Sequence, residues 1–156
     1  MRIAVVGGKL QGVEVVYLAI KAGFETVLID RNRDVPASKI CQSFLEFHFL
    51  SEGDWPEWPV EYGEIDLIFP ALENVQTLEL LEKWANFLQV PIVLDLSAYR
   101  LSNSKKISNV VFEKLKLPLP ASMPNCPFPV VIKPDQASGS EGVVIAQNKQ
   151  ELELVL

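Results

Sequence analysis

The side chains best suited to chemistry lie in two loops that combine lysine with glycine. The first loop, GGKLQG at residues 7–12, follows the apolar run RIAVV and precedes a helical pattern. Backbone N–H groups at the start of a helix attract a phosphate or a carboxylate, and Lys9 adds a positive charge at the same place. An anion site and a tight turn with an exposed lysine are equally open here.

The second loop, DQASGSEG at residues 135–142, separates the apolar runs VVIKP and GVVIAQN. Lys133 ends the first of these runs, and the loop offers the hydroxyls of Ser138 and Ser140 together with backbone N–H groups, as a lid over phosphate would. Lys105 or Lys106 could add a second positive charge. We expect a phosphate site here. The alternatives are an ordinary hairpin turn and a solvated pair of lysines.

Two acids follow apolar runs elsewhere in the chain. Asp30 ends the run TVLID, where an acid commonly accepts hydrogen bonds from ribose hydroxyls, although it could instead cap the next turn. Glu73 follows IDLIFP, at the end of a predicted strand, where open α/β sheets bind ligands. It could hold an ammonium, or it could be an acid favoured by the dipole of the next helix.

Other kinds of site are disfavoured. The single histidine, His48, lies on the predicted strand FLEFHFL, where a structural or edge role is favoured over a general base. No cluster has the spacing of metal ligands. The G-x-G-x-x-G fingerprint fails because Lys9 or Leu10 occupies the place of its middle glycine, and the P-loop pattern fails because Val13 follows Gly12. An oxidoreductase is therefore disfavoured.

Composition limits the partners. The chain of 156 residues, 49% hydrophobic, suffices for one full domain or for one small domain and part of another. A net charge of -6 argues against nucleic acid. Cys41 and Cys126 are isolated, which fits a reduced cytoplasmic setting. No signal peptide or membrane span is present in the sequence, so we expect no membrane partner.

The first part of the chain alternates strands and helices. The predicted strands are residues 2–6, 26–30, 44–50, 65–70 and 91–95, and the predicted helices are residues 10–21 and 74–88. Residues 53–63 are predicted to be a loop. This β-α-β-β-α-β order predicts an α/β fold with an open, mostly parallel sheet and helices on its faces.

The second part has a different character. A helix is predicted from about Ser104, followed by a connector at residues 118–129 that has five prolines in twelve residues. Two short strands then surround the second loop, and a final helix starts at Asn148 with Glu151 in a capping-box arrangement. We place domains at residues 1–100 and 101–156, the second being incomplete.

The order and spacing of the basic residues and the second loop resemble those of the ATP-grasp superfamily. The sequence has Lys105, then Lys133-Pro134, then a Ser/Gly loop that closes on EGV. The stretches VVGGKLQGVEVVYLAIKAG, DLSAYRLSNSKK and VIKPDQASGSEG are similar to the ATP-grasp ligases of pyrrolysine biosynthesis, GGKLQG being the most specific of them. The match covers the whole chain in the expected order. It implies a Rossmann-like pre-ATP-grasp domain, followed by the start of an α+β ATP-grasp lid domain.

The resemblance also implies an activity and a set of site residues. The carboxylate of 3-methyl-D-ornithine would be phosphorylated by ATP, and the ε-amine of L-lysine would attack the acyl phosphate. Mg²⁺ is implied as well, with its ligands and the catalytic core expected beyond residue 156, so neither metal ligands nor catalytic residues are assigned in this chain. The residues expected on the ATP side are Lys9, Asp30, His48, Phe49, Lys105, Lys133, Ser138 and Ser140. Those expected to hold L-lysine are Leu10, Gln11 and Glu73.

The chain alone is expected to be inactive, because the family's metal-binding core would follow it. Two other functions stay open from the residues. One is a different ATP-grasp carboxylate–amine ligase, and the other is a non-catalytic Rossmann-like module that binds a nucleotide or an amino acid. The sequence also leaves open whether the protein forms a homodimer.

Overall fold

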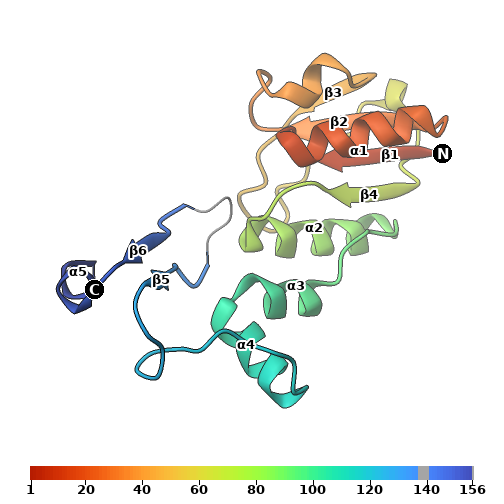
Figure 1. The fold of residues 1–156 in the computed structure, drawn as a ribbon. Helices are drawn as coiled ribbons and strands as arrows, with labels where there is room; N and C mark the ends of the chain where they lie inside the picture. The colour runs from red at the N-terminus through yellow and green to blue at the C-terminus, as the bar shows by residue number, and fades with distance from the viewer. Residues whose placement is uncertain (137–140, 156) are drawn as a thin grey trace. The chain divides into compact units, whose positions relative to one another are not determined.

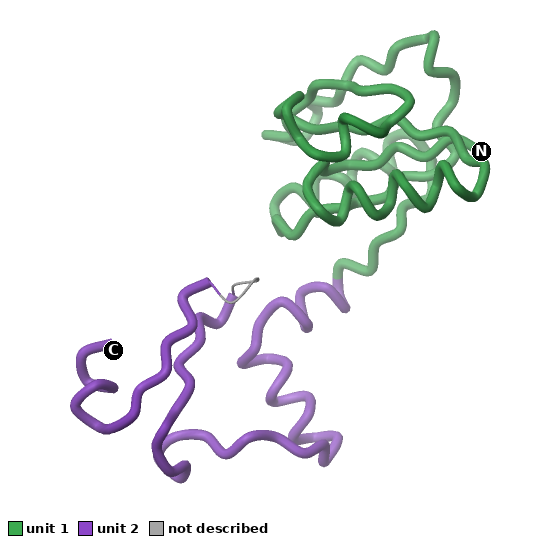
Figure 2. The backbone as a smooth tube through the Cα atoms, turned by 45° about the horizontal axis from the view of Figure 1, so that its top comes forward, with its two compact units in different colours: residues 1–96 green, residues 97–156 purple. Residues whose placement is uncertain are grey.

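The computed structural model describes residues 1–136 and 141–155. The chain divides into two compact units, Met1–Leu96 and Ser97–Leu156 (Figure 2). The assignment of domains to residues 1–100 and 101–156 stays a prediction. Each unit is described below by itself.

Four parallel strands form the sheet of the first unit, in the order β3-β2-β1-β4 (Figure 1). They are β1 (Arg2–Val6), β2 (Glu25–Asp30), β3 (Ser43–Glu46) and β4 (Leu67–Pro70). Helices α1 (Leu10–Lys21) and α2 (Val75–Leu88) pack against the sheet. This architecture confirms the prediction of an α/β fold with an open parallel sheet.

Alternate residues of β1 enter two separate apolar clusters. Ile3 and Val5 belong to a cluster that includes residues of α1, whereas Ala4 and Val6 belong to a second cluster that includes residues of α2. Successive side chains of a strand point to opposite faces of the sheet. A strand that is covered on both faces therefore has to be apolar throughout, which explains the uninterrupted run IAVV.

The third strand is shorter than the sequence predicts. β3 ends at Glu46, and the last four residues of FLEFHFL lie outside any strand. Phe49 is 5% exposed and packs with α2, its ring centroid 5.4 Å from that of Trp84 and 4.9 Å from that of Phe47. The alternation beyond Glu46 thus comes from packing against a helix. The prediction that His48 lies on a strand is wrong.

The predicted fifth strand, PIVLD, does not form either. This stretch makes one parallel bridge, between Ile68 and Ile92. The Ile68 N–H donates to the Pro91 carbonyl at 2.9 Å, and the Val93 N–H donates to the Ile68 carbonyl at 3.0 Å. Pro91 has no N–H with which to extend the ladder. Helix α3 (Leu96–Asn103), which the sequence analysis missed, follows almost directly.

The second unit is built from short elements. They are α4 (Lys105–Lys114), β5 (Val130–Ile132), β6 (Val144–Ala146) and α5 (Lys149–Val155), with most of α3 before them. β5 and β6 pair as an antiparallel hairpin, which confirms the two strands predicted around the second loop. Val130, Ala146 and Leu152 are the buried members of its small apolar cluster.

Two helices of this unit begin with side-chain caps. At α4, the Ser104 hydroxyl accepts a hydrogen bond from the Ile107 N–H at 3.2 Å. At α5, the Asn148 side-chain oxygen accepts from the Glu151 N–H at 3.0 Å, and the Glu151 carboxylate accepts from the Gln147 N–H at 2.8 Å. The predicted start of each helix is confirmed, although Glu151 binds the backbone of the residue before the cap.

The remaining segments are connections. Two short 3₁₀ helices, η1 (Pro36–Lys39) and η2 (Val60–Tyr62), lie in them. The proline-rich stretch at residues 118–129 contains neither helix nor strand, as predicted. Within the described part of the chain, no helix has both the length and the apolar character that a membrane crossing requires.

Candidate functional site

The carboxyl ends of β1 and β4 bring two predicted site segments together. β1 lies between β2 and β4, so the strand order reverses at β1 and β4. In open α/β sheets such a reversal creates a crevice at the carboxyl ends of the strands, where ligands bind. The first loop follows β1, and residues 71–74 follow β4. Both segments therefore lie at this place.

A hydrogen bond joins the two segments. The Gln11 Nε2 amide donates to the Glu73 Oε1 carboxylate oxygen at 3.0 Å, between residues 62 positions apart in the sequence. The Ala71 N–H donates to the Val6 carbonyl at 2.7 Å and so continues the strand pairing into the loops. Two of the three residues predicted to hold L-lysine are thus in direct contact. Leu10, the third, begins α1 with its side chain 73% exposed.

Asp30 binds the first loop. Its Oδ2 accepts a hydrogen bond from the Gly8 N–H at 2.7 Å, and its Oδ1 accepts from the Asn32 N–H at 2.9 Å. The second contact is the turn cap that was one alternative for this acid. The first contact occupies an amide that would otherwise be available to an anion. Because a carboxylate has about four acceptor positions, Asp30 retains capacity for a further donor such as a ribose hydroxyl.

The N-terminal end of α1 remains positively charged although Asp30 binds the Gly8 amide. Lys9 is exposed and is the N-cap residue of α1, but it provides no side-chain hydrogen bond to the helix start. The first N–H groups of an α-helix have no partner within the helix, so their partial positive charge favours an anion. The first loop can therefore attract a carboxylate or a phosphate through α1 and Lys9, without the Gly8 amide.

Two predicted nucleotide contacts differ in their surroundings. His48 is exposed, whereas the Phe49 ring belongs to the core between the sheet and α2. Any contact of Phe49 with a nucleotide would accordingly come from its backbone.

In the second unit, the lysines predicted to bind phosphate lie near the second loop. Lys133 is exposed and follows β5 directly, and the Lys105 Nζ donates to the Asp135 carbonyl at 3.1 Å. Gly142 has a φ of +69°, and a Cβ atom there would lie 2.8 Å from Cγ of Pro134, so the end of the loop requires glycine. Ser138 and Ser140 lie outside the described residues.

Asp135 is a residue of this region that the sequence analysis did not single out. Its carboxylate accepts hydrogen bonds from the Lys106 N–H at 2.9 Å and from the Ser104 hydroxyl at 3.0 Å. The hydrogen bond from Lys106 is the largest of the effects that hold the pKa of the Asp135 carboxyl below its usual range; Ser104 and the charges of Lys106 and Lys105 contribute further. A helix start near Ser104 and the lysine pair that follows were predicted from the sequence, but their acidic partner was not.

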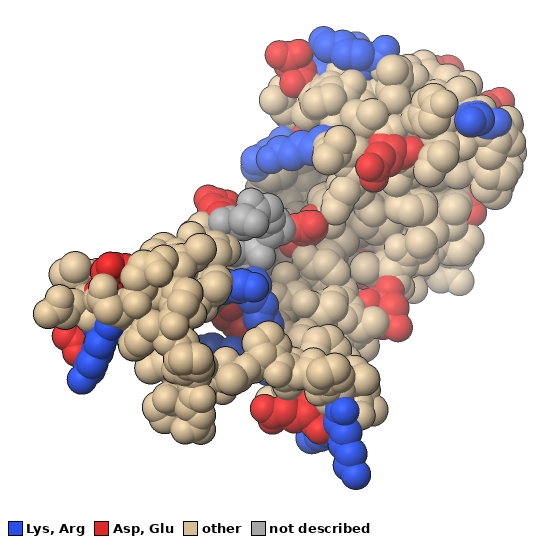
Figure 3. All heavy atoms as spheres, viewed as in Figure 1, with Lys and Arg blue, Asp and Glu red and all other residues tan. Residues whose placement is uncertain are grey.

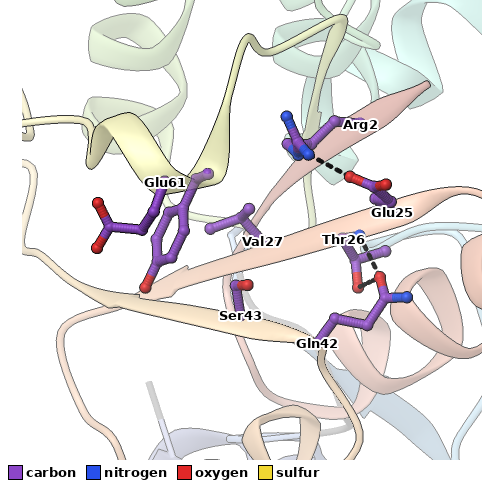
Figure 4. Close-up of a pocket in the computed structure, with 8 residues that line it drawn as sticks. Arg2, Glu25, Thr26, Val27, Gln42, Ser43 and Glu61 are labelled. Atoms are coloured by element: carbon purple, nitrogen blue, oxygen red, sulfur yellow. Dashed lines mark hydrogen bonds and ion pairs between the residues drawn. The ribbon is translucent and has the colours of Figure 1, made fainter.

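A shallow cavity of about 260 Å³ lies elsewhere on the first unit (Figure 4). It is lined by Arg2, Glu25, Thr26, Val27, Gln42, Ser43, Glu61 and Tyr62, so it lies near the starts of β1, β2 and β3, away from the first loop. Arg2 is ion-paired with Glu25, and the Gln42 side-chain oxygen accepts from the Thr26 N–H at 2.7 Å. Four of the lining residues thus bind one another, so we assign the functional site to the carboxyl ends of the strands instead.

The described residues offer no metal centre, and the Cys41 thiol is not activated. Among them, no group of three or more His, Cys, Asp or Glu side chains could hold a metal ion. Burial raises the pKa of the Cys41 thiol, which disfavours the reactive thiolate. On the face seen in Figure 3, the basic and acidic side chains of the described residues are interspersed. That surface is suited to small charged ligands at local sites rather than to a polyanion.

Comparison with known proteins gives several sequence matches. No protein-family model matches the chain. The 3-methyl-D-ornithine–L-lysine ligase of Methanosarcina barkeri is 35% identical over 152 residues, which cover 97% of this chain and 41% of that protein. The chain thus spans about two fifths of the length of the curated relatives that it matches.

Solved structures agree in fold. The N5-carboxyaminoimidazole ribonucleotide synthetase of Thermotoga maritima has a TM-score of 0.67 at 22% identity, over 99% of this chain and 43% of that one. The Staphylococcus aureus N5-carboxyaminoimidazole synthetase complexed with ADP has a TM-score of 0.71 at 19% identity, over 98% and 43%. The fold is that of the N-terminal part of ATP-grasp enzymes. The ATP-grasp fold class predicted from the sequence is confirmed.

Proposed function

We propose that this chain is the N-terminal part of an ATP-dependent ligase that joins 3-methyl-D-ornithine to the ε-amine of L-lysine. The observation that carries the proposal is the 3.0 Å hydrogen bond between Gln11 and Glu73 at the carboxyl ends of β1 and β4. It brings together an acid and an amide that suit an amino-acid ligand. The 35% identity to a 3-methyl-D-ornithine–L-lysine ligase supports the choice of substrates.

The first unit would bind L-lysine. The Glu73 carboxylate would accept hydrogen bonds from a ligand ammonium, a charge-assisted contact that is stronger than a neutral one. The Gln11 amide would hold that carboxylate in place. The N–H groups at the start of α1 would attract the ligand carboxylate, and the exposed Leu10 side chain would contact its aliphatic part.

The resemblance also supplies the residues proposed to contact ATP. In the second unit, Lys105 and Lys133 would balance the negative charge of the phosphates, which is the main task of a protein in phosphoryl transfer. In the first unit, Lys9 would contribute a positive charge on the ATP side. Asp30 would accept from the ribose, His48 and the Phe49 backbone would contact the nucleotide, and Ser138 and Ser140 would cover the phosphates. These assignments rest on the sequence resemblance and are part of the proposal.

The chemistry comprises two displacements. A carboxylate oxygen of 3-methyl-D-ornithine attacks the γ-phosphorus of ATP, and ADP leaves, giving an acyl phosphate. The ε-amine of L-lysine then attacks the acyl carbon, phosphate leaves, and the nitrogen loses a proton to form the amide. Mg²⁺ would add charge compensation on the phosphates. The described residues of this chain include no group that fits it, so we assign no metal ligand here.

The proposal includes a cytoplasmic location, which the free thiols of Cys41 and Cys126 support. Two alternatives differ from this proposal. Another ATP-grasp ligase would join a different carboxylate and amine, and a binding module would bind a nucleotide or an amino acid without catalysis. An oxidoreductase is disfavoured because the Gly8 amide of the first loop is bound to Asp30.

Substitution of Glu73 by Gln tests the L-lysine site. In the protein at its natural full length, E73Q should weaken L-lysine binding about tenfold or more while MgATP binding stays unchanged, because an ammonium loses its charged acceptor. Titration calorimetry with each ligand measures both. The charge-matched control is Glu14→Gln, on an exposed position of α1, which should change neither affinity. An unchanged L-lysine affinity in E73Q would remove Glu73 from the site.

The reaction itself is tested by ADP release. Wild-type protein at natural length should release ADP only when 3-methyl-D-ornithine and L-lysine are both present. Binding of NADH with no response to ATP would overturn the ligase proposal, and turnover with a different amine would favour another ATP-grasp ligase.

A further inference from the structure

Asp135 connects the two lysines of the second unit. It lies two positions after Lys133, and its backbone carbonyl accepts hydrogen bonds from the Lys105 N–H at 3.3 Å and from the Lys105 Nζ at 3.1 Å. Its carboxylate accepts from the Ser104 hydroxyl at 3.0 Å and from the Lys106 N–H at 2.9 Å. One residue therefore holds the start of α4 through both its backbone and its side chain.

These contacts matter because, among the described residues, α4 contributes no side chain to the buried core of its unit. No residue of α4 is buried. In the described part of the second unit, the apolar cluster consists of residues from the hairpin, from α5 and from the segment before β5, and takes none from α4. Ser104, by contrast, is 3% exposed and caps α4 while it donates to Asp135. The polar contacts at Asp135 are thus the main described link between α4 and the hairpin that carries Lys133.

We propose that Asp135 is a positioning residue, which fixes the Lys105 ammonium relative to Lys133 so that both can contact the polyphosphate of one nucleoside triphosphate. This inference rests on the proposed function. A lysine ammonium has three N–H donors and keeps its positive charge when one of them is bound to the Asp135 carbonyl. Asp135 itself does not touch the nucleotide. It would act by keeping two flexible side chains in a shared geometry, which reduces the entropy lost on binding.

Nucleotide affinities test this role in the protein at its natural full length. Asp135→Ala should weaken MgATP binding about tenfold, the lower end of the effect expected for a group that orients a ligand-binding side chain. AMP lacks the outer phosphates, so its affinity should not change. A general loss of structure would weaken both nucleotides. Asn148→Ala is the matched control, because it removes the cap of another helix in the same unit without touching Lys105.

A double-mutant cycle then asks whether Asp135 acts through Lys105. In a Lys105→Ala background, Asp135→Ala should have no further effect on MgATP affinity, whereas independent roles would give additive losses. If Asp135→Ala does not fold, as judged by its thermal transition, Ser104→Ala tests the same carboxylate contact from the other side and should show the same selectivity for MgATP.

The outcomes separate this inference from the proposed function. Wild-type protein that does not bind MgATP would overturn the proposed function and this inference with it. If wild-type protein binds MgATP, three results for Asp135→Ala would overturn only the positioning role. They are an unchanged MgATP affinity, an equal loss of MgATP and AMP affinity, and a loss that adds to that of Lys105→Ala.

Discussion

Gly7 has a backbone conformation, with φ at +105°, that residues with a side chain rarely adopt. A Cβ atom at this position would lie 2.6 Å from the Ala71 carbonyl oxygen. The loops after β1 and β4 can approach as closely as they do only because that atom is missing. The contact between Gln11 and Glu73 depends on this approach.

Gly7→Ala should therefore lower the free energy of unfolding by about 1–3 kcal/mol, since it adds backbone strain and a steric clash. Chemical denaturation measures the loss. Gly53→Ala is the control, because Gly53 also has a positive φ, at +85°, but has nothing within 4 Å of its Cβ position. The Gly53 variant reports strain without the clash, so equal losses in the two variants would contradict the steric explanation.

Single residues also show why a site can be only partly predicted from sequence. The sequence left Asp30 with two alternatives, a ribose acceptor and a turn cap. Its shortest hydrogen bond to the backbone, from the Gly8 N–H, was not among them. Asp135 was missed because its partners lie about thirty positions earlier in the chain. Such contacts depend on the tertiary structure. Gln11 and Glu73 were named through the resemblance, not through their spacing.

Among the helices and strands, the prediction was correct where the pattern of apolar residues indicated a single kind of burial. The strands buried on both faces and the two long helices with apolar stripes formed as expected. Two strand predictions were wrong in whole or in part. FLEFHFL forms β3 only as far as Glu46, after which its phenylalanines pack against α2, and PIVLD makes a single bridge to β4. An alternating pattern indicates which side chains are buried, but it does not say whether their backbone pairs with a strand.

The packing of Phe49 can be tested by truncation. Phe49→Ala should lower the free energy of unfolding by about 3–5 kcal/mol, because it leaves a cavity beside Trp84. Phe87→Ala removes the same side chain from a position that is 68% exposed, and should cost about 1 kcal/mol or less. Both are measured by urea denaturation. A loss of nucleotide affinity in Phe49→Ala at unchanged stability would instead favour a ring that contacts ATP directly.

The link between α4 and the hairpin should depend on pH. The folded-state pKa of Asp135 lies below its ordinary value of 3.8, so its ionised carboxyl stabilises the fold above that pH. The contribution is lost as the pH falls through the folded pKa. Asp135→Asn should accordingly show a shallower loss of stability than wild type between about pH 5 and pH 2. Urea denaturation across this pH range measures the free energy of unfolding, with Asp54→Asn as the control. If the free energy of wild type and of Asp135→Asn fell in parallel with pH, Asp135 would not be the cause of the pH dependence.

At the scale of the whole molecule, the fold class followed from the order of apolar runs, and the likeness to ATP-grasp structures agrees with it. The sequence matches about two fifths of its curated relatives, so the activity is proposed for the protein at its natural full length.

We predict that these 156 residues alone catalyse no ligation. The expected reason is the resemblance, which places the metal-binding core in the part of the relatives that this chain does not match. ADP release with L-lysine and 3-methyl-D-ornithine, compared between this chain and the natural full-length protein, is the measurement. Substrate-dependent turnover by this chain alone would show that the prediction is wrong.

The hydrogen bond between Asp30 and Gly8 has a practical consequence for motif searches. A single substitution, Lys9→Gly, would change the first loop to GGGLQG and create the G-x-G-x-x-G spacing from residues 7, 9 and 12. Yet the Gly8 amide would still be bound to Asp30, and Val35 would still pack where a Gly8 Cβ atom would lie. We expect such a variant to gain the fingerprint of a dinucleotide enzyme without gaining affinity for NADH.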